Sequence, residues 1–181
     1  MKTIEELIHE RLQEQSQDKN INPALLKKEK EILEDVFLNG KSMGKSIGIS
    51  EEMIRFMYNE GCRLYSAGKY KEASQCFHLL VMLDGNFARY SFGAAACHHL
   101  LKEYEEAFSL YFNAAQLDQE DPLPFYHMFD CLMALDDPEF ASVMLMTAID
   151  RMKKDPKYSQ LQVKAELSLK GLEESLKKDN A

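Results

Sequence analysis

Apolar and polar positions follow helical spacing along most of the chain, and one stretch of this pattern repeats. Residues 65–73 align with 99–107 and 133–141, so that Ala73, Ala107 and Ala141 recur at a constant period of 34. Counted from starts at 54, 88 and 122, these alanines hold position 20, and four further columns agree. They are position 8 (Gly61, Ala95, Phe129), position 11 (Leu64, His98, Leu132), position 24 (Phe77, Tyr111, Leu145) and position 27 (Leu80, Ala114, Ala148). Five columns at one period predict three helix–turn–helix repeats, at about 54–87, 88–121 and 122–155.

A helical repeat of this period with these marks is the tetratricopeptide (TPR) pattern. Small residues at positions 8 and 20 let helix A and helix B of one repeat approach closely, and the large apolar residue at 24 fills the space between repeats. Phe129 breaks the small-residue rule at position 8, so we expect wider helix packing in the third repeat. Asp121-Pro122 and Asp137-Pro138 have the cap-and-proline chemistry of helix starts.

Residues 1–49 precede the repeats and are predicted to hold two helices and a loop. Thr3 and Glu6 form a capping box that opens a helix to about residue 15, followed by a loose polar segment over 16–22. Asn22-Pro23 opens a second helix, and the glycine-containing stretch 39–48 is predicted to be a loop. Ser50 then caps the first repeat helix.

Residues 156–177 are predicted to form an amphipathic helix that covers the open end of the repeats. Its apolar residues recur at spacings of three and four from Tyr158 to Leu176, between lysines and glutamates. Residues 178–181 are expected to be a disordered tail. The predicted fold class is therefore all-α, a TPR solenoid of three repeats over 50–155 with N-terminal helices and a C-terminal capping helix.

Composition narrows the possible functions. The net charge of −8 argues against binding to nucleic acid or to an anionic membrane surface. The longest apolar run, 79–83, is far too short to span a bilayer, so no stable membrane insertion is expected, and the N-terminus has no secretory h-region. The four cysteines lie within apolar helical patterns, which suits a reducing cytoplasm.

Stacked TPR helices present the A helices on the inner face of a superhelix, with positions 2, 5, 9 and 12 pointing inward. Each aromatic residue there, taken alone, fits a helix core as well as a groove, and its repeat position is what favours a peptide-binding groove rich in aromatic anchors. The inward residues are Arg55, Tyr58, Cys62 and Tyr65 in the first repeat, Arg89, Phe92, Ala96 and His99 in the second, and Leu123, Tyr126, Asp130 and Met133 in the third.

The sequence offers little for catalysis or metal binding. Cys97-His98-His99 has no second ligand pair at a zinc-like spacing, and Cys76 and His78 lie two positions apart on one helix, so they point to different faces. The glycine-containing loop lacks the Gly-Lys-Ser/Thr arrangement of a phosphate-binding loop. We therefore predict no enzyme activity, no cofactor and no metal site.

Further marks carry a resemblance to one bacterial family. They are the run Gly68-Lys69-Tyr70-Lys71-Glu72-Ala73, the segment Gly93-Ala94-Ala95-Ala96-Cys97, and Phe125-Tyr126-His127 leading into Asp130-Cys131-Leu132. Together they resemble class II type III secretion chaperones of the SycD/LcrH type, over about residues 36–155. The resemblance implies a protein of the bacterial cytoplasm that binds hydrophobic translocator proteins through a short proline- and leucine-bearing segment and keeps them soluble for export. It also implies a possible homodimer formed through the N-terminal helices.

Other TPR partners remain as alternatives. The polar clamp that grips the C-terminal carboxylate of heat-shock chaperones is missing, because its places hold Tyr58, Cys62, Gly93, Leu123 and His127. A scaffold or adaptor for another protein, such as a needle-subunit chaperone, would use the same fold. Co-expression with membrane-active proteins distinguishes these alternatives by which partner becomes soluble.

Overall fold

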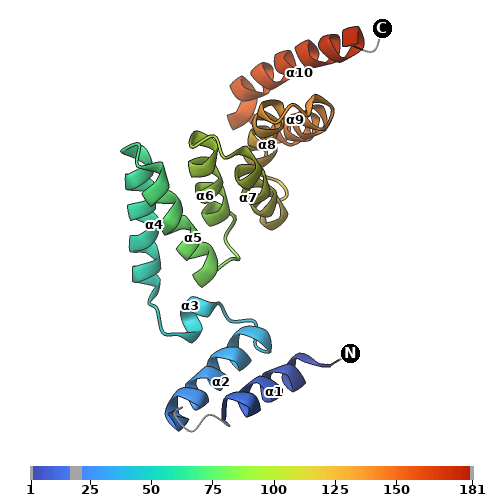
Figure 1. The fold of residues 1–181 in the computed structure, drawn as a ribbon. Helices are drawn as coiled ribbons and strands as arrows, with labels where there is room; N and C mark the ends of the chain where they lie inside the picture. The colour runs from blue at the N-terminus through green and yellow to red at the C-terminus, as the bar shows by residue number, and fades with distance from the viewer. Residues whose placement is uncertain (1, 17–21, 180–181) are drawn as a thin grey trace.

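A computed structural model describes residues 2–16 and 22–179 of the chain. The described residues form helices and connecting turns, with no strand among them. Figure 1 shows an elongated molecule with the N-terminal helices at one end and the last helix at the other. The helices are α1 (Ile4–Ser16), α2 (Pro23–Phe37), α3 (Met43–Ser46), α4 (Glu51–Ser66), α5 (Tyr70–Leu83), α6 (Ala88–Leu100), α7 (Tyr104–Leu117), α8 (Leu123–Ala134), α9 (Pro138–Met152), the 3₁₀ turn η1 (Pro156–Tyr158) and α10 (Ser159–Asp179).

The three repeats correspond to the pairs α4–α5, α6–α7 and α8–α9, and each helix packs mainly on its neighbours in sequence. The turn from helix A to helix B has the same backbone in every repeat. Gly68, Lys102 and Asp136 hold the same position in successive repeats and have φ angles of 74°, 63° and 60°. In each turn the amide that follows this residue donates to a carbonyl near the end of helix A, as in Lys69 N–H to Leu64 O at 2.9 Å. This Schellman closure satisfies the last carbonyls of helix A, and it confirms the repeat period in the backbone itself.

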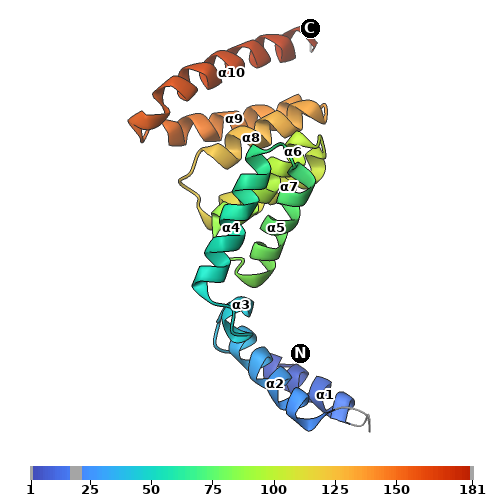
Figure 2. The ribbon, with the colours of Figure 1, turned by 90° about the vertical axis from the view of Figure 1, so that its left-hand side faces the viewer.

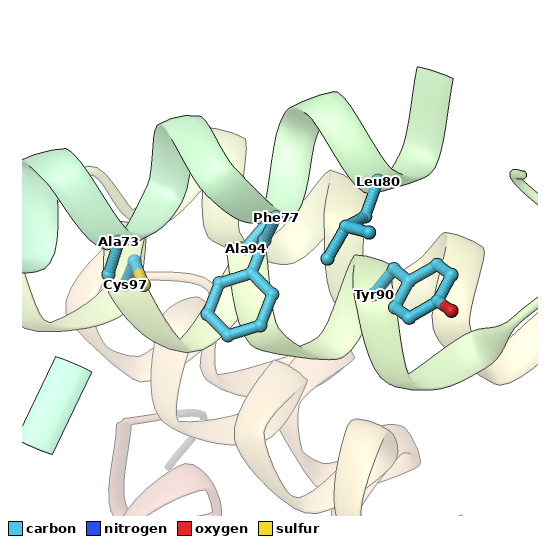
Figure 3. Packing of buried hydrophobic residues seen from close by; sticks show 6 residues of the cluster. All are labelled: Ala73, Phe77, Leu80, Tyr90, Ala94 and Cys97. Carbon is cyan, nitrogen blue, oxygen red and sulfur yellow. The ribbon is translucent and has the colours of Figure 1, made fainter. Parts of the chain in front are cut away.

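The core follows the repeat columns. The position-20 alanines and the position-27 residues are fully buried, and the position-24 residues Phe77, Tyr111 and Leu145 are no more than 3% exposed. Figure 3 shows the first of these clusters, where Phe77 and Leu80 of α5 face Tyr90, Ala94 and Cys97 of α6. The buried faces of α5 and α7 therefore join one repeat to the next, and that of α9 joins the third repeat to α10.

Glycine is needed beside Phe77. A Cβ at Gly61 of α4 would lie 3.1 Å from the Phe77 ring, and one at Gly93 of α6 would lie 2.7 Å from it. Position 8 is therefore small in the first repeat because an aromatic ring occupies the space. The third repeat has Phe129 at this position, and its ring is partly buried against the clusters of α9 and α10. Wider packing of that helix pair stays a prediction.

The predicted caps at Thr3, Asn22, Ser50 and Asp137 are present, whereas α8 has Pro122 rather than Asp121 as its N-cap, and Asp121 Oδ1 accepts from Leu123 N–H at 3.0 Å. Thr3 and Glu6 exchange the two hydrogen bonds of a capping box, at 2.8 and 3.2 Å. Ser50 Oγ accepts from Met53 N–H at 3.2 Å, and Asp137 Oδ1 accepts from Phe140 N–H at 3.1 Å. These side chains fix where the helices begin, because each accepts from an amide of the first turn that has no partner within the helix.

The segments outside the repeats differ from expectation in two places. The predicted loop over 39–48 contains the one-turn helix α3, which packs near the end of α5, with buried Gly44 next to Leu83. The last helix begins with the 3₁₀ turn η1, and α10 continues to Asp179, past the predicted end at 177. Of the predicted tail, residues 180–181 lie outside the described residues, as does most of the loose segment 16–22.

Helix α10 lies against α9 and crosses one end of the molecule in Figure 2. Its Ala165 and Leu172 are buried, and Leu161 and Leu169 pack on the cluster of Leu145 and Ile149. At the other end, α1 and α2 form a hairpin whose only buried side chain among the described residues is Ile8. The hairpin exposes apolar residues, including Leu7, Leu25 and Phe37 at 51%, 64% and 55%.

Candidate functional site

A cavity of about 360 Å³ lies between α4 and α6, the A helices of the first two repeats. Six of the residues predicted to face inward line it: Tyr58, Cys62, Tyr65, Arg89, Phe92 and Ala96. Three lining residues were not predicted: Ser66, Phe77 and Gly93. Phe77 comes from helix B, and its ring enters the cavity because Gly61 and Gly93 leave room for it. Phe77 holds repeat position 24, whose residue was expected to fill the space between repeats and not to line the groove.

Aromatic rings form much of the cavity wall and pack edge-on against one another. Tyr58 lies 5.9 Å from Phe77 and 5.8 Å from Tyr90, measured between ring centroids. Tyr65 packs on Tyr70 at 5.4 Å. Such tilted and T-shaped contacts hold the rings in fixed orientations, so the cavity offers a preformed apolar surface with little ordering cost on binding.

The two tyrosine hydroxyls at the cavity are neutral hydrogen-bonding groups. Partial burial raises the pKa of Tyr58 and of Tyr65 above the ordinary value of 10.0, with Cys62 close to Tyr58 and Cys97 close to Tyr65. A neutral phenol both donates and accepts a hydrogen bond. The cavity can therefore pair with the backbone of an extended segment while its rings contact apolar side chains.

Arg89 stands at the rim of this cavity, in a cage of aromatic rings. Its guanidinium carbon lies 5.1 Å from the ring centroid of Tyr58, 5.0 Å from that of Phe87 and 5.1 Å from that of Tyr90. The guanidinium also donates to the Tyr90 hydroxyl at 3.2 Å. Cation–π contacts and this hydrogen bond hold the charge in one place. Arg55 does not line the cavity; it lies in a second hollow, beside the first turn of α4.

The remaining predicted residues lie beyond this cavity, toward the third repeat. His99 packs on Tyr104 at 5.7 Å and on His127 at 5.9 Å between ring centroids. The His127 ring lies 3.4 Å from the Asp130 carboxylate, measured from Nδ1 to Oδ2. Tyr126 is partly buried against His127, and Met133 is 42% exposed. The structure thus brings the first two repeats together around one cavity but gives the third repeat no part in its lining.

One polar cluster was not predicted from the sequence. His78 of α5 and His98 of α6 meet with their Nε2 atoms 2.9 Å apart, and His98 Nδ1 lies 2.6 Å from Glu103 Oε2. Burial, together with His98, lowers the pKa of His78 below its ordinary value of 6.5. The two histidines lie on different helices, and no helical periodicity connects their positions in the sequence.

Two absences hold for the described part of the chain. Within residues 2–16 and 22–179, no helix combines the length and apolar character needed to cross a membrane. Over the same ranges, no group of three or more His, Cys, Asp or Glu side chains is arranged to hold a metal ion.

Comparison with known proteins finds bacterial chaperones, although no family model matches the chain. The chain is 30% identical to PcrH of Pseudomonas aeruginosa in its complex with the chaperone-binding region of PopD, covering 71% of this chain and 96% of that one with a TM-score of 0.69. It is 26% identical to the type III secretion translocator chaperone SycD of Yersinia enterocolitica, solved as an alternative dimer, covering 72% and 98% with a TM-score of 0.67. It is 25% identical to the low calcium response locus protein H of Yersinia pseudotuberculosis, covering 81% of this chain and 86% of that protein.

Proposed function

Because the chain belongs to the type III secretion translocator chaperones, we propose that it binds hydrophobic translocator proteins in the bacterial cytoplasm and keeps them soluble until export. The observation that carries the proposal is the aromatic cavity between α4 and α6, lined by six residues at inward repeat positions. Peptide binding of this kind requires no enzyme activity. The relatives' translocator partners favour this function over the needle-subunit alternative.

The cavity would hold an extended segment of the translocator rather than its membrane-inserting parts. Tyr58, Tyr65 and Phe92 would contact apolar side chains of that segment, and Cys62 and Ala96 are small enough to leave room for them. Rigid aromatic residues are the usual anchors of protein interfaces. The translocator segment can also be released at export, because the cavity is small, its walls are partly exposed and only a few side chains make the contact.

The groove residues of the third repeat would extend the contact. His99, Tyr126 and Asp130 are partly buried and Met133 is exposed, so each has surface left for a ligand. The exposed apolar residues of the α1–α2 hairpin support a homodimer formed through that hairpin. The related SycD has been solved as a dimer, which supports dimerisation in general.

The test replaces two anchors together. We expect Tyr65→Ala with Phe92→Ala to weaken binding of a peptide from the chaperone-binding region of PopD by at least a hundredfold, because hot-spot aromatics each contribute about 2 kcal/mol or more. Fluorescence anisotropy measures the affinity, and circular dichroism checks the fold.

A matched control removes two aromatic rings outside the cavity. Phe112 and Phe140 are 50% and 44% exposed on the B helices α7 and α9. Phe112→Ala with Phe140→Ala should leave the affinity unchanged. Normal peptide binding by a folded Tyr65→Ala, Phe92→Ala protein would rule out the cavity as the binding site.

A further inference from the structure

A second cavity, of about 340 Å³, adjoins the first. It lies where α3 and the first turn of α4 meet the end of α5 and the start of α6. Arg89 lines both cavities. A segment that runs from the aromatic cavity into the second would pass this arginine. The charged side chains that line the second cavity are Lys45, Glu51, Arg55, Asp84 and Arg89.

The two arginines of this cavity form no ion pair with an acid among residues 2–16 and 22–179. Among the residues that the structure describes, neither Arg55 nor Arg89 lies within 4.0 Å of a carboxylate oxygen. Neither of the two acids of the lining forms an ion pair with a described residue. Asp84 accepts from the side-chain amide of Asn86 at 3.3 Å, and Glu51 lies in the first turn of α4, where the helix dipole favours negative charge.

The local charge has the opposite sign to that of the whole chain. Three cations and two acids line the cavity, a net charge of +1, while the whole chain carries −8. The aromatic cage already orients the Arg89 guanidinium, so little side-chain entropy is lost when it binds a ligand. A guanidinium fork matches the two oxygens of a carboxylate.

We propose that this second cavity receives an aspartate or glutamate side chain of the bound segment, next to the apolar residues that fill the aromatic cavity. Arg89 is the main contact and Arg55 the second. The inference rests on the proposed function, because it concerns the same segment, and it adds a charge requirement to an otherwise apolar specificity. The polar clamp that other TPR domains use for a chain terminus is absent, and we assign the carboxylate to a side chain.

The first experiment selects ligands without assuming a client. A display library of random twelve-residue peptides is selected on the full-length protein. Each peptide is joined at both ends to the display protein, so that it has no free C-terminus. Binders should share apolar residues and carry an acid at a fixed offset from them. Selection on Arg55→Gln with Arg89→Gln should keep the apolar residues and lose the acid. Arg63→Gln is the matched control, since Arg63 is on α4 but pairs with Glu60 at 2.6 Å outside the cavity.

The second experiment measures the charge dependence. The tightest selected peptide is synthesised with Asp, Asn or Lys at the acidic position, each with an amidated or a free C-terminus. We expect Asn to weaken binding by about tenfold and Lys to weaken it further, with no effect of the C-terminus. The Asp-to-Asn difference should shrink in Arg89→Gln and vanish in Arg55→Gln with Arg89→Gln.

The outcomes separate the two proposals. Apolar binders with no acid preference, or equal affinity of the Asp and Asn peptides, would overturn the charge requirement and leave the proposed function standing. A dependence on the free C-terminus in place of the side chain would overturn the assignment to a side-chain carboxylate. Selection that yields no binder sensitive to Tyr65→Ala with Phe92→Ala would remove both proposals.

Discussion

The close contact between Gly93 and the Phe77 ring gives a prediction whose size can be worked from the structure. In Gly93→Ala the new Cβ would stand 2.7 Å from Cδ1 and Cε1 of Phe77 and 2.9 Å from Cζ. Ordinary contacts begin near 3.4 Å, so the ring must move by about 0.7 Å. Phe77 is only 3% exposed and already lies close to Gly61, which limits that movement.

Two opposing contributions set the expected change in the free energy of unfolding. Overpacking of this kind costs about 1–3 kcal/mol. Replacing glycine by alanine within a helix stabilises it by roughly 0.5–1 kcal/mol. Gly93→Ala should therefore be destabilised by about 1 kcal/mol, within a range of about 0–2.5 kcal/mol, and a loss of about 1 kcal/mol lowers Tm by roughly 2–4 °C for a chain of this size.

Gly171→Ala is the matched control. Gly171 lies within α10 and nothing approaches its Cβ position within 4 Å, so only the helical gain of roughly 0.5–1 kcal/mol remains. Urea unfolding followed by circular dichroism measures both variants against the parent protein. Equal stabilisation by the two substitutions would refute the argument that Phe77 needs the space at Gly93.

Two further predictions concern titratable groups that are partly or fully buried. Since burial lowers the pKa of His78, the unfolded chain takes up a proton that the folded chain resists, and stability falls as pH drops below 6.5 toward the folded-state pKa. Urea titrations at about pH 7.5 and about pH 5.5 should show a smaller loss in His78→Gln than in the exposed control His9→Gln; equal losses would contradict this cause. Burial also raises the pKa of the Cys97 and Cys131 thiols to about 12. Iodoacetamide at about pH 8 should label them only after unfolding, and peptide mass spectrometry showing rapid labelling in the native protein would disprove their protection.

Much of the fold follows from the sequence because the repeat imposes one geometry three times. The period of 34 predicts which residues are buried, and local chemistry predicts the helix starts at Ser50 and Asp137. The one-turn helix α3 was missed because so short a segment carries no readable periodicity. The left-handed backbone at Lys102 and Asp136 carries no mark in the sequence, because neither position has the glycine found at the equivalent residue 68.

The site was less predictable, for a physical reason. Repeat position tells which side chains point inward, but whether they share one cavity depends on the angle between successive repeats. That angle joins Tyr65 and Phe92 and leaves Met133 apart. The contribution of Phe77 and the meeting of His78 with His98 both depend on how α5 lies against α6, which no single helix pattern contains.

The succession of contacts along the solenoid has a consequence for kinetics. Nearly every major contact joins a helix to its neighbour in sequence, so little chain must be closed into long loops before native packing begins. Chains with such local topology typically fold in microseconds to milliseconds. A protein whose proposed task is to meet an aggregation-prone client gains from this, because its binding surface is complete soon after its own synthesis ends.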